Sequence, residues 1–277
     1  GSRRVIALYP GDHPEVSKNV ADAKSRLAKA IELKPEDPSS HAILAYLANN
    51  EYVDLASSYK AMPEGKEKSE MQFESYIDGL TVILETIKRE QRNNIERAGL
   101  LLADALAAGG IIHAFGTGHS HLIADEAFFR AGGIAAVNPI LHERLIFLEG
   151  AFESTRTEQE SGFARRLLVE ENVKSVDAGI VISNSGRNAA PIEMALEMNA
   201  LGLKVIAITN LEQSRTSTTR HSSGKRLFEV VDVVIDNCVP TGDALLELSG
   251  LESRIGPSST VAGATIINCV IIEAVTE

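Results

Sequence analysis

The chain has 277 residues, of which 44% are hydrophobic, enough to bury one sizeable core and leave room for an appended segment. Only 5% of the residues are aromatic, tryptophan is absent, and the formal net charge is -11. This composition argues against binding to nucleic acid or to an anionic membrane, because acidic proteins repel both and base-stacking sites need aromatic faces. The N-terminus shows no signal-peptide pattern, so the expected location is cytoplasmic.

The first part of the chain predicts short helices. Residues 12–62 have apolar positions at helical spacing, with prolines that break the pattern. Residues 28–62 faintly resemble a tetratricopeptide repeat, but such arrays need about three units and this segment holds little more than one. We therefore predict a helical extension over residues 1–65 and a main domain over 66–277, with the polar residues 63–70 at the boundary.

The main domain has the pattern of an α/β fold. Two helices are predicted at 71–88 and 91–108, and a long apolar helix at 258–276. Between them, five short apolar runs rich in β-branched residues predict strands at 111–115, 134–138, 178–183, 204–209 and 231–236. Apolar strands that alternate with helices indicate a parallel sheet covered on both faces. The prediction is a doubly wound, flavodoxin-like sheet of five parallel strands.

Two polar loops follow the first and third predicted strands. They read Gly116-Thr117-Gly118-His119-Ser120 and Ser183-Asn184-Ser185-Gly186-Arg187. In the strand order 2-1-3-4-5 these strands are neighbours, and ligands of open parallel sheets bind at the carboxyl ends of the strands. Hydroxyls, glycine-rich turns before a helix and an arginine all suit an anion. Because the first loop lacks both the lysine of a P-loop and the dinucleotide fingerprint, the loops predict an anion-binding crevice of another kind.

The sequence around these loops resembles the sugar isomerase (SIS) domain family. The resemblance is carried by FGTGHS (115–120), SNSGRNAAPIEMALEMNALGLKVIAITN (183–210) and FEVVDVVID (228–236), and it covers about residues 71–277. The chain is similar to phosphoheptose isomerases and to N-acetylmuramic acid 6-phosphate etherases, the latter through GPSSTVAGATIIN (256–268). It resembles most closely a group of bacterial SIS proteins without an assigned activity. The resemblance implies a small phosphorylated sugar as ligand.

The resemblance also implies which residues hold the phosphate. Ser120, Ser183 and Ser185 would bind it, with Thr117 nearby. Hydroxyls at the start of the last helix could add to the same site or to that of a neighbouring subunit, although Ser258 is equally a plain helix N-cap. The full candidate set is Gly116, Thr117, Gly118, Ser120, Ser183, Asn184, Ser185, Gly186, Arg187, Ser258, Ser259 and Thr260.

Aldose–ketose interconversion needs an acid and a base, and the sequence offers a glutamate and two histidines for these roles. Glu126, two turns into the helix after the first loop, is the candidate base. Phosphoheptose isomerases have a catalytic histidine at this position and a glutamate one turn later, where this chain has Arg130. His119 at the mouth of the crevice is the candidate acid, and His221 could reach a site across a subunit interface. A surface carboxylate and solvated histidines are the alternative interpretations.

Three functions fit this residue set. The leading hypothesis is a sugar-phosphate isomerase. An etherase or other lyase acting on an amino-sugar phosphate needs similar groups, and a non-catalytic module that senses sugar phosphates needs only the binding residues. The N-terminal helices do not form a basic recognition unit, which argues against a DNA-binding regulator.

No cofactor and no metal are expected, since no Cys-x-x-Cys pair exists and His119 and His121 would face different directions on a helix. The helices at 71–108 and the last helix have apolar faces to bury, and SIS domains resemble one another in pairing through such faces. A homodimer or homotetramer is therefore expected.

Overall fold

The computed structural model of the chain describes residues 72–249, 251 and 253–277. The predicted helical extension over 1–65 and the boundary at 63–70 lie outside the described residues.

Contacts within the chain define two units. One comprises residues 70–245 and 256–277, and the other comprises 1–69 and 246–255. The first unit contains the parallel sheet, the helices that cover it and all the residues of the candidate site.

The five-stranded sheet has the order β2-β1-β3-β4-β5, and its neighbouring strands are all parallel. Its strands are β1 (Ile112–Gly116), β2 (Val137–Ile140), β3 (Ala178–Ile182), β4 (Lys204–Thr209) and β5 (Val233–Asp236). This is the predicted doubly wound order, and Gly116 at the end of β1 lies opposite Ile182 at the end of β3. The two polar loops therefore leave the sheet side by side.

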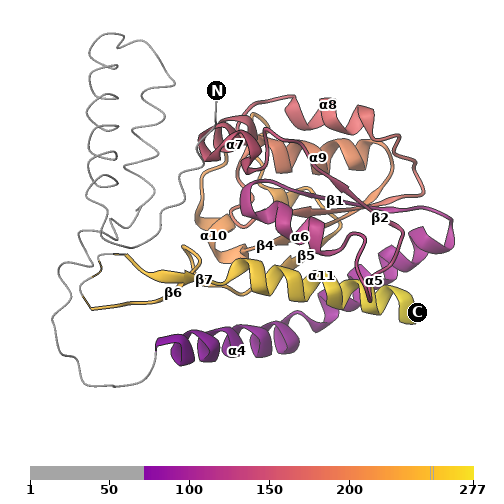
Figure 1. Cartoon of the computed structure of the whole chain (residues 1–277). Coiled ribbons are helices and arrows are strands. Elements are labelled where there is room, and N and C mark those ends of the chain that lie inside the picture. The colour runs from indigo at the N-terminus through magenta and orange to yellow at the C-terminus, as the bar shows by residue number, and fades with distance from the viewer. Residues whose placement is uncertain (1–71, 250, 252) are drawn as a thin grey trace, which may run out of the picture. The chain divides into compact units, whose positions relative to one another are not determined.

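The helices divide between the two faces of the sheet (Figure 1). The α-helices are α4 (Gln72–Glu90), α5 (Arg92–Ala107), α6 (His121–Glu126), α7 (Ala151–Glu158), α8 (Phe163–Glu170), α9 (Ala189–Ala200), α10 (Leu211–Thr216) and α11 (Ser259–Thr276). Short 3-10 turns are η1 (Gly118–Ser120), η2 (Phe147–Glu149) and η3 (Leu227–Glu229). The helices α4, α5, α6 and α11 share one hydrophobic cluster with the sheet, and α8 and α9 share the other.

Alternation along each strand explains why both faces are covered. In β3, Ile180 and Ile182 belong to the cluster under α5 and α11, whereas Val181 between them belongs to the cluster under α8 and α9. Successive side chains of a strand point to opposite faces, so a continuous apolar run buries both.

Three details differ from the prediction. The second strand begins at Val137 rather than at 134, and its pairing with β1 starts at Ile112–Val137. The fifth strand begins at Val233 rather than at 231. A small second sheet pairs β6 (Ala244–Leu246) with β7 (Ile255–Pro257). These strands are only three residues long, too short for a periodic pattern to reveal.

Within the described residues, α11 is the one helix long and apolar enough to cross a membrane by length and composition. It packs along α5 and also contacts α4 and α6. Its buried residues are Ala262, Gly263, Ile266, Ile267, Val270, Ile271 and Ala274. This packing against neighbouring helices accounts for the apolar residues on the buried face of α11.

Candidate functional site

The loop after β1 turns back sharply at Gly116. A Cβ atom on this residue would lie 2.4 Å from the carbonyl oxygen of Ser120, so the loop can close only around a glycine. The backbone N–H of Gly118 donates to the carbonyl of Leu145 at 2.9 Å, which ties the loop to the segment after β2. The close turn places His119 and Ser120 above the end of the strand.

The loop after β3 is shaped by one of its own serines. Ser183 is buried, and its Oγ accepts a hydrogen bond from the N–H of Gly186 at 3.2 Å. Gly186 has φ +58°, a conformation that favours glycine. The Arg220 N–H donates to the Arg187 carbonyl at 2.7 Å and holds the loop from outside. Ser185 and Arg187 make no side-chain hydrogen bond to any described residue, so both are available to a ligand.

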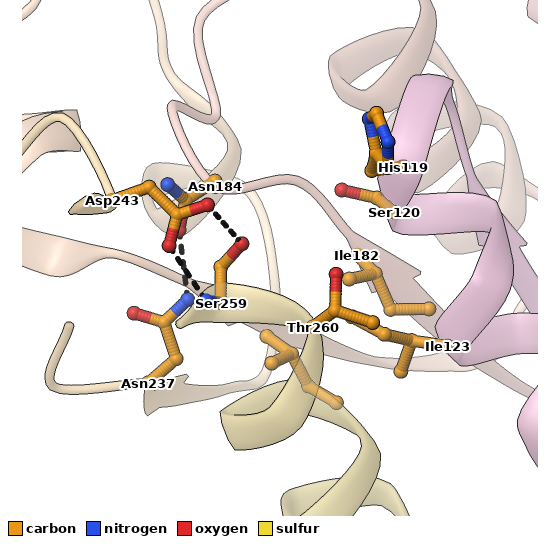
Figure 2. Close-up of a pocket in the computed structure, with 10 residues that line it drawn as sticks. His119, Ser120, Ile123, Ile182, Asn184, Asn237, Asp243, Ser259 and Thr260 are labelled. Carbon is orange, nitrogen blue, oxygen red and sulfur yellow. Dashed lines mark hydrogen bonds between the residues drawn. The ribbon is translucent and has the colours of Figure 1, made fainter. Parts of the chain in front are cut away.

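A cavity of about 170 Å³ lies between these loops and the start of α11 (Figure 2). Its lining residues are His119, Ser120, Ile123, Ile182, Asn184, Ile208, Asn237, Asp243, Ser259 and Thr260. Three isoleucines make the apolar part, and the rest is polar. Five of the sequence-predicted site residues therefore meet in one place: His119, Ser120, Asn184, Ser259 and Thr260.

Three of the polar side chains that line the cavity have no hydrogen-bond partner in the described part of the chain: His119, Ser120 and Thr260. The ring of His119 packs against that of Phe147, with centroids 4.7 Å apart. The hydroxyls of Ser120 and Thr260 lie on opposite sides of the space between η1 and the first turn of α11 (Figure 2). These side chains can hydrogen-bond a bound polyhydroxyl compound.

Asn184 and Asn237 line the cavity on the side opposite His119 and Ser120 (Figure 2). The Nδ2 of Asn237 donates to the Oδ1 of Asn184 at 2.8 Å, linking the loops that follow β5 and β3. The sequence prediction did not include Asn237. Its position directly after the fifth strand is a usable signal, because all parallel strands end at the same edge of the sheet.

Asp243 binds the first turn of α11. Its Oδ1 accepts from the N–H groups of Ser258 and Ser259 at 2.9 and 2.6 Å, and its Oδ2 accepts from the Ser259 hydroxyl at 2.7 Å. The Ser258 hydroxyl is buried and donates to the Asp243 carbonyl at 2.9 Å. Ser258 thus stands at the N-cap position, but the carboxylate of Asp243 does the capping.

A second carboxyl group, Glu158 at the end of α7, lies beside the loop after β1. The hydroxyl of the buried Thr117 donates a hydrogen bond to Glu158 Oε1 at 2.7 Å. Burial raises the pKa of Glu158, against the opposing effect of hydrogen bonds from Thr117 and Asn188 and of the charges on Arg220 and Arg187. Nothing in the local sequence around Glu158 marks it, and only the packing of α7 brings it to this position.

The predicted base and the third predicted catalytic residue lie elsewhere. Glu126 is ion-paired with Arg130 and accepts a hydrogen bond from Asn268 of α11 at 3.1 Å. Like Glu158, it is not among the residues that line the cavity. The Nε2 of His221 lies 3.7 Å from Glu193 on α9, and His221 does not line the cavity either.

Among residues 72–277 apart from 250 and 252, no three His, Cys, Asp or Glu side chains lie close enough to share a metal ion.

Comparison with known proteins shows which families the chain is similar to. The profile of the SIS domain matches residues 75–210. A UPF0309 protein of Listeria innocua is 42% identical over 201 residues, covering 73% of this chain and 81% of that protein. A second UPF0309 protein, from Thermoanaerobacter pseudethanolicus, is 42% identical over 204 residues, covering 72% of this chain and 83% of its own.

Among solved structures, the chain is similar to a phosphoheptose isomerase from Neisseria gonorrhoeae. The TM-score is 0.50 at 15% sequence identity, and the match covers 74% of this chain and 98% of the other. At this identity the likeness shows the fold, and it confirms the predicted α/β architecture. The chain therefore belongs to the UPF0309 proteins and contains a SIS domain over residues 75–210.

Proposed function

We propose that the chain binds a small sugar phosphate at the carboxyl ends of β1 and β3 and interconverts its aldose and ketose forms by proton transfer. One observation carries this proposal. The two loops that flank the polar cavity also hold an arginine without an ion pair in the described chain, Arg187, close enough for its charge to act on the carboxyl group of Glu158. A cation for the phosphate and a carboxyl for proton transfer thus occupy one edge of the sheet.

The phosphate would lie at the loop after β3. Ser185 offers a free hydroxyl and Arg187 a free guanidinium, which matches phosphate oxygens well. The same loop leads into α9, whose 12 residues present free N–H groups and a partial positive charge at their start. Arg220, whose Nη1 donates to the Asn188 side chain at 3.2 Å, adds positive charge nearby.

For the base, we propose Glu158 in place of Glu126. Glu126 is held by Arg130 and Asn268, and this contact suits a role in fixing α6 against α11. Glu158 is partly buried, and the raised pKa of its carboxyl group suits a proton acceptor. Its carboxylate would take a proton from the carbon next to the sugar carbonyl and return it to the former carbonyl carbon. His119 would give a proton to the carbonyl oxygen and take one from the neighbouring hydroxyl.

Thermal-shift measurements with sugar phosphates of three to seven carbons test the binding step. At a ligand concentration 100 times Kd, native-state binding adds about 2.7 kcal/mol to stability, so the melting temperature rises by several degrees. We expect a rise with phosphorylated sugars and none with the matching free sugars. Arg187→Ala should abolish the rise, whereas Arg165→Ala on the exposed side of α8 should preserve it.

A turnover assay on each ligand that binds then tests the reaction. Appearance of the ketose from the aldose, followed by NMR, supports the isomerase. Binding with no turnover of any ligand would instead assign the chain to the sensing modules. Release of lactate from N-acetylmuramic acid 6-phosphate would assign it to the etherases. No shift with any sugar phosphate would overturn the proposed function.

A further inference from the structure

The α11 end of the cavity has its own negative charge. An 18-residue helix begins there with N–H groups that lack intrahelical partners and with a partial positive charge. Such a helix end attracts anions, including phosphate. In this chain the carboxylate of Asp243 already occupies it, bonded to the N–H groups of Ser258 and Ser259.

This carboxylate is held in place by several contacts. The side-chain carboxylate of Asp243 accepts the hydrogen bonds described above. In addition, its backbone carbonyl accepts from both the N–H and the hydroxyl of Ser258, at 3.1 and 2.9 Å. Asp243 also has φ +69°, a left-handed conformation that is costly outside glycine, though aspartate and asparagine tolerate it best. The turn before β6 therefore fixes the carboxylate on the end of α11.

The cavity has no lysine or arginine in its lining, and its one basic side chain is the imidazole of His119. Among the described residues, the Oδ2 of Asp243 accepts only from the Ser259 hydroxyl, whereas a carboxylate oxygen has two lone pairs. This end of the cavity thus offers an acceptor to hydroxyl or ammonium groups and repels a second negative charge. Arg187 and Arg220 instead lie at the loop after β3, where their charges act on Glu158.

We propose that Asp243 is a specificity-determining residue that reserves the α11 end of the cavity for the hydroxyl- or amine-bearing end of the sugar and excludes a second anionic group. This inference rests on the proposed function, which assigns the phosphate to Ser185 and Arg187. The substrate class is therefore a sugar monophosphate, as opposed to a sugar bisphosphate or a phosphorylated sugar acid.

Matched pairs of ligands test the exclusion. An alditol phosphate and the aldonate phosphate of the same length and stereochemistry differ only in whether the far end is a hydroxyl or a carboxylate. We expect calorimetry to show that the protein prefers the alditol phosphate by about tenfold or more, since one unfavourable charge contact is worth at least this much in a partly desolvated pocket. Equal affinity for both members of every pair would overturn the inference.

The substitution Asp243→Asn removes the charge and keeps an oxygen that can accept from the two backbone N–H groups. Asparagine also tolerates the left-handed backbone, so the variant should fold. We expect the preference for the alditol phosphate to fall to within about threefold. Asp104→Asn, the same change on the exposed face of α5, should leave the preference unchanged. An unchanged preference in Asp243→Asn would contradict the assignment.

A second measurement does not depend on any sugar binding. Crystals of the protein and of Asp243→Gly are soaked with tungstate, whose anomalous signal locates a phosphate-like anion. Tungstate at the first turn of α11 in the variant alone supports the inference. Tungstate there in the unmodified protein, or in neither, overturns it. A protein that binds no sugar phosphate would refute the proposed function, while this experiment would still decide the role of Asp243.

Discussion

Two glutamates, Glu126 and Glu158, differ in what surrounds them. Glu126 lies in α6 with Arg130 one turn later, and the ion pair between them neutralises its charge. Glu158 ends α7, and burial raises its pKa while Thr117 donates a hydrogen bond to it. A carboxyl group kept partly out of water is costly for stability, and such costs are characteristic of functional residues. These environments favour Glu158 for proton transfer.

Replacing Glu158 and Glu126 separately tests which of them is the catalytic base. Glu158→Gln keeps the shape and the hydrogen bond from Thr117 but cannot accept a proton. We expect kcat to fall by about 10² to 10⁴, the usual contribution of a general base, with ligand affinity little changed. The matched change Glu126→Gln should reduce kcat by less than about threefold, since it removes only a partly exposed ion pair. The reverse ranking in steady-state kinetics would restore Glu126 as the base.

The stability prediction follows from the same pKa. Because the folded-state pKa of Glu158 is raised, the native state binds this proton more strongly than the unfolded chain does. The group therefore contributes fully to stability below its unfolded pKa, and that contribution is lost as pH rises through the folded pKa. Glu158→Gln should gain melting temperature relative to the unmodified protein as pH increases from about 4 to about 8. A difference in melting temperature that is constant over this range would contradict the assignment.

At the scale of elements, the site depends on how closely α11 packs on its neighbours. Thr260 lies in the first turn of α11, Asp243 accepts hydrogen bonds from that turn, and α11 lies along α5. The two helices approach at Gly99 of α5, where a Cβ atom would lie 2.5 Å from the Cβ of Glu273 and 3.3 Å from the backbone nitrogen of Ala274. The glycine lets α11 settle on the sheet and so helps to place its first turn.

The substitution Gly99→Ala tests this packing. Alanine favours helix over glycine by about 1 kcal/mol, but overpacking costs about 1–3 kcal/mol. We expect a net loss of stability in urea denaturation. Asn93→Ala on the exposed face of the same helix improves helix propensity without adding a contact, so it should be neutral or slightly stabilising. A Gly99→Ala variant as stable as Asn93→Ala would show that the helices can separate at no cost.

At the scale of the whole molecule, α4 carries more apolar surface than the described residues cover. Only Ile83 and Ile87 of its 19 residues are buried. Phe73, Ile77 and Val82 are 55%, 53% and 66% exposed. Phe73 and Ile77 are one turn apart and share a face of the helix, and exposed apolar residues that share a face can mark an interaction surface. The expectation of a homodimer or homotetramer stays a proposal, and α4 is the surface through which we propose that two copies pair.

Sedimentation velocity tests the pairing. We expect the unmodified protein to sediment as a dimer or larger. Ile77→Asp should shift it toward the monomer, because burying an unpaired charge in an apolar interface is costly. Val169→Asp, on an 80% exposed position of α8, should sediment like the unmodified protein. A monomer before any substitution, or a dimer that Ile77→Asp leaves intact, would exclude α4 as the interface.

The sequence by itself determined the five strands, their alternation with helices and the two loops at the sheet's carboxyl edge. These features are local, because apolar runs and glycine-rich turns act over a few residues and chain direction places all strand ends of a parallel sheet together. Only the tertiary structure decided which side chains are free. Ser183 and Ser258 carry hydroxyls like that of Ser185, yet packing commits them to the loop and to Asp243.

The recruitment of distant residues was likewise decided by tertiary structure. Thr117 and Glu158 are 41 positions apart, and Asn184 and Asn237 are 53 apart. No periodic pattern encodes such pairs, because they depend on how helices and loops pack on the sheet. The sequence therefore determined where a ligand meets this protein, and the packing decided which carboxylates and hydroxyls it meets there.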